Sequence, residues 1–280
     1  MNALEIHGLK KHYGDFTLDI GELCLPAGCI MGLVGENGAG KSTTIRLIMD
    51  MLRADGGTVT VLGRDNRDGF RSTKEDVGVV LDEVGIPGLT AVQTGRVMAL
   101  AYKNWDQAAF DGLVRRLDIP ADKSFADLSR GNRMKLGIAA ALSHHARLLI
   151  LDEATNGLDP VVRDEVMELL NDFTRDERNA ILMSSHIVSD LEKICDYIAF
   201  LHKGRILLCE AKDELTETYG VLRCSAERIA ELDPAAVLTR RDTDYGTEAI
   251  VRRDRIPVGT ELGFVTVEDI FVGMVKGEER

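Results

Sequence analysis

The sequence lacks the features that would place the protein across a membrane. Its long uncharged apolar stretch, residues 23–35, contains Pro26 and is shorter than the about 20 residues that a bilayer-spanning helix needs. Residues 1–5 do not form the basic and apolar segments of a secretory signal. If the protein works at a membrane, we expect other chains to supply the membrane-spanning helices.

The sequence also has few cysteines, and its acidic residues outnumber its basic ones. The odd number and scattered positions of the cysteines predict reduced, mostly buried thiols, as in cytosolic proteins. There are 34 lysines and arginines against 46 acidic residues, for a net charge of −12. This charge argues against a general nucleic-acid-binding surface, although a local basic patch stays open. The cysteines, none of them in a C-x-x-C pair, are Cys24, Cys29, Cys195, Cys209 and Cys224.

A phosphate-binding pattern is present near the N-terminus. Glycines there let successive backbone N–H groups point at phosphate oxygens, and a helix start adds its positive end. Lys41 offers a point charge to the β- and γ-phosphates, and the Ser42 hydroxyl is a ligand for Mg²⁺. The alternative is a tight turn between strand and helix that happens to fit. The segment that matches G-x-x-x-x-G-K-[ST] is Gly35-Glu36-Asn37-Gly38-Ala39-Gly40-Lys41-Ser42.

The order of apolar patterns predicts an α/β fold with a largely parallel sheet. Ligands of such sheets bind at the carboxyl ends of the parallel strands. Residues from Thr90 to about Ala146 have helical patterns, which predict an inserted helical subdomain. We expect strands at 4–9, 16–20, 59–62, 77–81, 148–151, 180–183, 197–201 and 205–209. The continuous apolar run at 77–81 is typical of a strand buried on both faces. Lys203-Gly204 predicts a hairpin between the last two strands, and Asp159 followed by Pro160 predicts the start of a helix.

Beyond residue 210 the patterns weaken and predict a small C-terminal α+β appendage at 211–280. Helices are expected there at 213–219 and 267–276, and strands at 248–251 and 264–267. The first domain would then span residues 1–210, with its helical subdomain at about 87–146.

Polar residues lie at positions where this fold would place catalytic, metal-binding and nucleotide-binding groups. Asp152 and Glu153 follow the apolar run 148–151. In a phosphate-loop protein the first carboxylate holds Mg²⁺, and the second is placed to orient and deprotonate the attacking water. The alternative is a solvated acidic pair at a strand end. Tyr13 either stacks on adenine or is an ordinary half-buried turn residue.

Together these motifs resemble those of the ATP-binding subunits of ABC transporters. Five segments carry the resemblance, in the order that the family shows, over about residues 3–210. The signature segment separates this family from other phosphate-loop ATPases. The segments are 35–43 (Walker A), 128–132 (signature), 148–153 (Walker B), 156–159 (D-loop) and the switch histidine His186.

The resemblance implies a phosphate-loop ATPase core with an antiparallel β subdomain and an inserted helical subdomain. It also implies that two nucleotide domains meet head to tail with ATP between them. Lys41, Glu153 and His186 would be the catalytic residues, and ATP and Mg²⁺ the cofactors. The metal would lie at Ser42, Asp152 and Asp82. Tyr13 and the segment from Gly35 to Thr43 would bind the nucleotide of their own subunit. We expect Gly131 to open a helix, whose first amides and Ser129 would form a second anion-binding site. The residues that would act on the partner's ATP are Ser129, Arg130, Gly131, Asn132 and Asp159.

Two residues depart from the family's pattern. Arg130 replaces a glycine of the usual Leu-Ser-Gly-Gly-Gln signature, which alters close backbone approach but adds charge near the phosphates. Asp82 stands where the family places a glutamine; a carboxylate binds Mg²⁺ but repels the γ-phosphate more than an amide does. Both departures resemble those found in bacterial exporter subunits of the drug, antibiotic and lantibiotic-immunity type.

We therefore expect an ATPase that forms a homodimer or heterodimer on ATP and drives export through separate permease subunits. It would lie peripherally on the cytoplasmic face of the membrane. The rival interpretation is a non-transport ABC ATPase of DNA repair or ribosomes, but such proteins typically carry long coiled coils or two fused ATPase domains. A third interpretation is a regulatory module that holds ATP without hydrolysing it, which a phosphate-release assay would separate.

Overall fold

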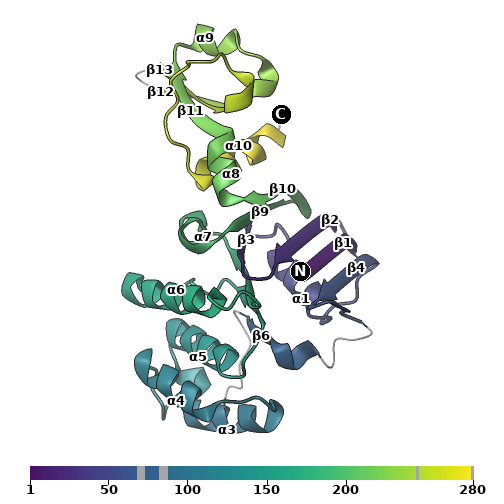
Figure 1. Cartoon of the computed structure of the whole chain (residues 1–280), viewed down its shortest axis with the longest axis vertical. Coiled ribbons are helices and arrows are strands. Elements are labelled where there is room, and N and C mark those ends of the chain that lie inside the picture. Colours follow the sequence, from purple (N-terminus) through teal and green to yellow (C-terminus); the bar gives the residue numbers. More distant parts are fainter. Residues whose placement is uncertain (68–72, 82–87, 244–245, 279–280) are drawn as a thin grey trace.

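The computed structural model describes residues 1–67, 73–81, 88–243 and 246–278. The molecule is elongated (Figure 1). At one end lie the helices α3 (Ala91–Ala101) and α4 (Gln107–Arg116). A ten-stranded sheet forms the middle, and a three-stranded sheet lies at the other end.

The large sheet joins a parallel half to an antiparallel half, as the predicted fold class requires. Its strands are β1 (Asn2–Tyr13), β2 (Phe16–Pro26), β3 (Ile30–Val34), β4 (Gly56–Val61), β5 (Arg64–Asp65), β6 (Val77–Val80), β7 (Leu148–Asp152), β8 (Ala180–Ser185), β9 (Tyr197–His202) and β10 (Arg205–Ala211). They lie in the order β5-β4-β1-β2-β10-β9-β3-β8-β7-β6. From β9 through β3, β8 and β7 to β6, neighbours are parallel. The pairs β1–β2, β1–β4, β4–β5 and β9–β10 are antiparallel.

Burial explains why the central strands read as continuous apolar runs. Every residue of β3, β7 and β8 is buried, because alternate side chains of these strands pack into two large apolar clusters, one on each face of the sheet. β6 lies at the edge of the sheet, and its Val79 is only partly buried. The expectation that this strand is buried on both faces is therefore wrong at Val79.

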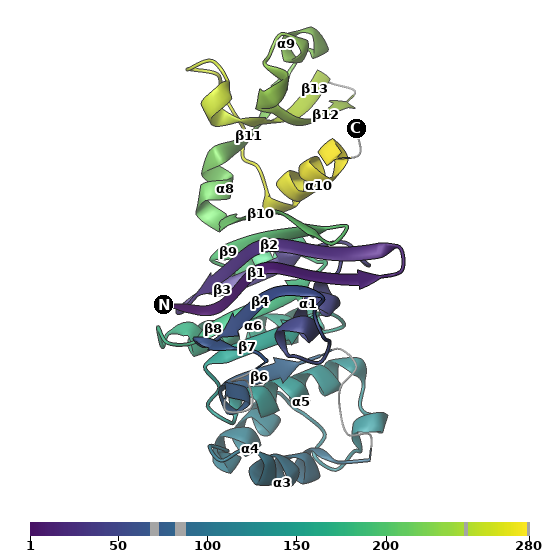
Figure 2. The same cartoon turned by 90° about the vertical axis from the view of Figure 1, so that its right-hand side faces the viewer.

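Helices follow the parallel strands and build the expected helical region. α1 (Lys41–Ile48), α6 (Pro160–Thr174) and α7 (Val188–Ile194) follow β3, β7 and β8. As predicted, Asp159 caps α6 and Pro160 is its first residue. α5 (Arg130–Leu142) contacts α3, α4 and β6. The helical region is thereby packed against the edge of the sheet (Figure 2).

The C-terminal segment contains an antiparallel sheet in the order β11-β13-β12. Its predicted helices and the strand at 248–251 are confirmed, whereas β11, β12 and α9 were not predicted. The strand expected at 264–267 is wrong, because Thr266 and Asp269 cap each other's amides and turn the chain into a helix. The elements are α8 (Lys212–Thr218), β11 (Tyr219–Cys224), α9 (Ala226–Ala230), β12 (Val237–Thr243), β13 (Gly246–Arg252) and α10 (Val267–Glu278).

α8 and α10 lie between the two sheets in both views (Figures 1 and 2). Ile270 and Phe271 of α10 belong to the main apolar core, and the ring centroids of Phe271 and Phe200 are 5.2 Å apart. The three-stranded sheet has a small cluster of its own around Leu222 and Val251. The core thus crosses the expected boundary at residue 210, and the division into 1–210 and 211–280, with a subdomain at 87–146, stays a proposal.

All five cysteines are free thiols, but only Cys195 is buried. The expectation of mostly buried thiols is therefore wrong, because Cys24 lies on β2, which alternates between buried and more exposed residues, and Cys209 lies on β10, whose residues are at most partly buried. Burial raises the pKa of the Cys209 thiol to about 11.

Within the described residues, no helix combines the length and the apolar character needed to cross a membrane.

Candidate functional site

The phosphate loop joins the buried strand β3 to α1. Gly40 precedes the helix with a φ of 112°, and no side chain caps the first turn. Glycine is favoured there, because a side chain would be strained at this φ and an added Cβ would lie 2.7 Å from Cδ1 of Leu18. Among the residues that the structure describes, the amides of Lys41, Ser42 and Thr43 have no hydrogen-bond partner. Such open donors at a helix start attract anions.

Lys41, Glu153 and His186, the predicted catalytic residues, lie in one cluster. The Lys41 side chain is 6% exposed, and its Nζ donates to the carbonyl oxygens of Gly35 at 2.7 Å and Glu36 at 3.3 Å. The same Nζ lies 3.3 Å from Oε1 of Glu153. Oε2 of Glu153 lies 2.6 Å from Nδ1 of His186. The carboxylate therefore bridges a lysine and a histidine.

Ser184, at the end of β8, organises the two carboxylates. Its hydroxyl donates to Oδ1 of Asp152 at 2.6 Å, and the Glu153 amide donates to its main-chain oxygen at 3.1 Å. Glu153 itself has a φ of 54°, a left-handed conformation that is unusual outside glycine and often found at functional sites. Sequence reasoning did not single out Ser184. Its signal is a polar residue that ends a buried strand beside the Walker B strand.

Lys41, Glu153 and His186 line a cleft of about 540 Å³ at the carboxyl ends of β3, β7 and β8. Phe16, not Tyr13, is the aromatic residue in its wall; Tyr13 is 41% exposed and pairs with Phe16 across the β1–β2 hairpin. The adenine contact of Tyr13 stays a prediction. The cleft is lined by Phe16, Glu36, Asn37, Gly38, Gly40, Lys41, Ser42, Thr43, Glu153, Asn156 and His186.

The structure describes Ser42 and Asp152, two of the three residues that the sequence assigned to Mg²⁺. Asp152 is 6% exposed, and the Ser184 hydroxyl holds its Oδ1. Asp82 lies outside the described residues. In the described ranges, no group of three or more His, Cys, Asp or Glu side chains could by itself hold a metal ion. One carboxylate and one hydroxyl fit Mg²⁺, which is commonly bound by few protein ligands together with substrate phosphates.

The signature segment lies away from this cleft. Ser129 caps α5 by accepting a hydrogen bond from the Asn132 amide at 3.3 Å, so the helix begins at Arg130 rather than at Gly131. A Cβ on Gly131 would lie 3.3 Å from the oxygen of Gly157 in the D-loop. Within the described part of the chain, neither residues 129–132 nor Asp159 line the cleft.

Comparisons with known proteins agree with this geometry. Residues 18–156 match the model of a family described as ABC transporter. A bacitracin transport ATP-binding protein from Enterococcus faecalis is 31% identical over 209 residues, which cover 73% of this chain and 68% of the relative. The chain belongs to the ABC transporter family of ATP-binding proteins.

Two further comparisons extend this ABC ATPase assignment. A daunorubicin/doxorubicin resistance ATP-binding protein from Streptomyces peucetius is 31% identical over 97% of this chain and 92% of its own length. A solved ATP-binding subunit of an ABC transporter is 29% identical, with a TM-score of 0.68 over 76% of this chain and 91% of that one. The protein is thus an ATP-binding and ATP-hydrolysing transporter subunit.

Proposed function

We propose that this ABC ATPase dimerises on ATP and drives export through separate membrane subunits. One observation carries the proposal: of the helix starts at the phosphate loop (α1) and at the signature segment (α5), only that of α1 lines the cleft. The signature at α5 therefore needs the ATP of a second subunit, as a head-to-tail dimer would provide. The cargo we infer from the relatives' names is an antibiotic or related drug.

In this proposal each residue of the cleft has a distinct role. Open amides of the phosphate loop and Lys41 bind the phosphates. Because phosphate oxygens compete for the Lys41 ammonium, they release Oε1 of Glu153, which can then accept a proton from the attacking water. His186 contacts the other carboxylate oxygen and would contact the γ-phosphate of a bound ATP. Mg²⁺, when bound with ATP, would neutralise phosphate charge, with Ser42 and Asp152 as its protein ligands.

The dimer is tested with two variants and static light scattering in Mg-ATP. Glu153→Gln should bind ATP, fail to hydrolyse it and run as a dimer. Adding Ser129→Arg to Glu153→Gln should return the chain to a monomer that still binds ATP, because Ser129 would contact only the partner's nucleotide. If the double variant stays dimeric, or if Glu153→Gln stays monomeric at saturating ATP, the head-to-tail arrangement is wrong.

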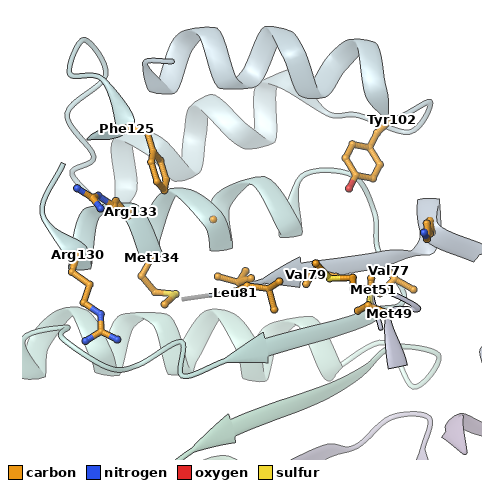
Figure 3. A pocket seen from close by; sticks show the side chains of 13 residues that line it. Met49, Met51, Val77, Val79, Leu81, Tyr102, Phe125, Arg130, Arg133 and Met134 are labelled. Carbon is orange, nitrogen blue, oxygen red and sulfur yellow. The ribbon is translucent and has the colours of Figure 1, made fainter. Parts of the chain in front are cut away.

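A groove between β6 and the helical region is the surface we propose for the membrane subunit. It has a volume of about 290 Å³ and is mainly apolar. Met49 and Met51 lie near Val77 at one end, and Phe125 and Met134 at the other (Figure 3). A subunit that hydrolyses ATP for transport must pass its motion to a membrane chain, and exposed apolar grooves are typical of such contacts.

Two exposed apolar residues allow a matched test of this groove. Met51 lines the groove and is 56% exposed. Leu100, on α3, is 90% exposed and does not line the groove. In detergent, Met51→Glu should weaken co-purification with a membrane protein encoded beside this chain, and Leu100→Glu should not. Equal recovery of the two variants would place the contact elsewhere.

The antibiotic tolerance of cells that carry this chain tests whether the cargo is a drug. In the native host, cells with the wild-type chain should tolerate more bacitracin or daunorubicin than cells with Glu153→Gln. Equal tolerance across a panel of antibiotics would remove drug export, but would leave the ATPase activity of the chain untouched.

A further inference from the structure

The turn between β9 and β10 supports the phosphate loop. The amide of Gly204 donates to the main-chain oxygen of Ala39 at 3.0 Å. A Cβ on Gly35 would lie only 2.5 Å from the main-chain oxygen of Leu201, so the two backbones are in direct contact. His202, the last residue of β9, lies between these two contact points along the chain.

His202 is buried without a hydrogen bond. Its side chain is 1% exposed, and neither ring nitrogen has a hydrogen-bond partner within the described residues. Its Nδ1 lies 3.4 Å from Oε2 of Glu36, which is within range of an ionic contact but outside hydrogen-bond geometry. A buried polar group without a partner lowers stability, so a hydrophobic residue would suit the fold better here.

Glu36 connects His202 to the nucleotide cleft. Its main-chain oxygen accepts a hydrogen bond from Lys41, and its half-exposed side chain lines the cleft. The Glu36 carboxylate and the phosphates of ATP would therefore share a small space, where like charges repel strongly.

We propose that His202 is a positioning residue of the phosphate loop. Its Nδ1 holds the Glu36 carboxylate beside β9 and so keeps this negative charge away from the phosphates of ATP. A small rotation of the exposed Glu36 side chain completes the hydrogen bond and satisfies the buried ring. The histidine thus acts on ATP through Glu36 and does not touch the nucleotide.

The test is a double-mutant cycle on the full chain, with ATP affinity measured by calorimetry. His202→Leu should weaken Mg-ATP binding by about fivefold to tenfold, because the carboxylate is then free to face the phosphates. In a Glu36→Gln background the same change should alter affinity by less than about twofold. Equal losses in both backgrounds would show that His202 only packs the hairpin and would overturn the proposal.

A conservative variant and salt separate positioning from folding. His202→Asn keeps an N–H donor near the place of Nδ1, so ATP affinity should stay within about twofold of wild type. The penalty of His202→Leu should shrink between about 0.05 and 0.5 M salt, because charge repulsion is screened. Equal weakening by Asn and Leu, with no effect of salt, contradicts the proposal. In hydrolysis the change should appear in KM for ATP and not in kcat.

Discussion

The starts of α1 and α5 use their first-turn amides differently. α1 follows Gly40, has no side-chain cap, and opens into the cleft that contains Glu153. α5 follows Ser129, whose hydroxyl already accepts a hydrogen bond from the Asn132 amide, and it packs against the D-loop. The start of α1 lines the active cleft of its own chain, whereas the start of α5 contacts the D-loop and does not line that cleft.

This difference assigns them different tasks in the proposed dimer. The helix dipole attracts phosphate at both sites, but at α5 a side-chain cap already uses one amide donor. α1 is therefore suited to hold ATP within one subunit. α5 is suited to a second, weaker contact that forms only when a partner presents its ATP.

The largest expected effect tests whether the chemistry lies on the α1 side. Glu153→Gln should reduce ATP hydrolysis by about 100-fold or more, because an amide is no general base, while ATP binding is retained. Phosphate release and calorimetry measure the two. Glu177→Gln, at an exposed carboxylate before β8, serves as the control and should behave like wild type. Turnover of Glu153→Gln within a few-fold of wild type would remove Glu153 from this role.

The second prediction separates the two helix starts. Ser129→Ala should lower hydrolysis by about 10-fold to 100-fold, the value of a hydrogen bond to a charged group. ATP affinity of the isolated chain should stay within about twofold, because α1 holds the nucleotide alone.

Ser225→Ala is the matched control for this variant. Ser225 caps α9 in the C-terminal segment and does not line the cleft. Ser225→Ala therefore removes a similar helix cap, which typically contributes about 1 kcal/mol of stability. If Ser129→Ala and Ser225→Ala hydrolyse ATP equally well, the role of α5 in catalysis is wrong.

The third prediction concerns the charge at the start of α5. Arg130 is the first residue of that helix, where the proposed dimer brings it near the partner's phosphates. Arg130→Gly should weaken ATP-dependent dimerisation of the Glu153→Gln chain by about twofold to fivefold, and Arg130→Lys should weaken it less. Analytical ultracentrifugation measures both. Tighter association of the glycine variant would mean that Arg130 hinders closure.

The smallest expected effect is a change in folding stability with pH, caused by a histidine next to α5 and far from α1 in the sequence. His144 follows α5, stacks on Tyr102 with 4.1 Å between ring centroids, and is buried. Burial lowers its pKa from the ordinary 6.5, so below that pH the unfolded chain binds a proton that the folded chain resists. Stability should therefore fall as pH drops through about 6.5.

Thermal unfolding at a series of pH values measures this effect. Between about pH 7.5 and 5.5 the wild-type midpoint should fall by about 2–4 °C more than that of His144→Gln, which has no group to protonate there. Parallel curves for the two proteins would show that His144 is not the responsible group.

The sequence anticipated the parts of the fold that depend on near neighbours. The hairpin at Lys203–Gly204 and the cap at Asp159 are read from adjacent residues, and the structure confirms both. The strand expected at 264–267 failed for the opposite reason. Its residues alternate like a strand, but a local Thr266–Asp269 cap outweighs that pattern. Asp82 lies outside the described residues, so its metal role stays a prediction.

By itself, the sequence determined the phosphate loop, the paired carboxylates and the family, because glycine spacing and apolar periodicity act over a few residues. Only the tertiary structure decided that Ser184 joins Asp152 to Glu153, that Phe16 rather than Tyr13 lines the cleft, and that His202 lies beside Glu36. These contacts join residues far apart in the chain. The order of strands in the sheet brings them together, and no local pattern encodes that order.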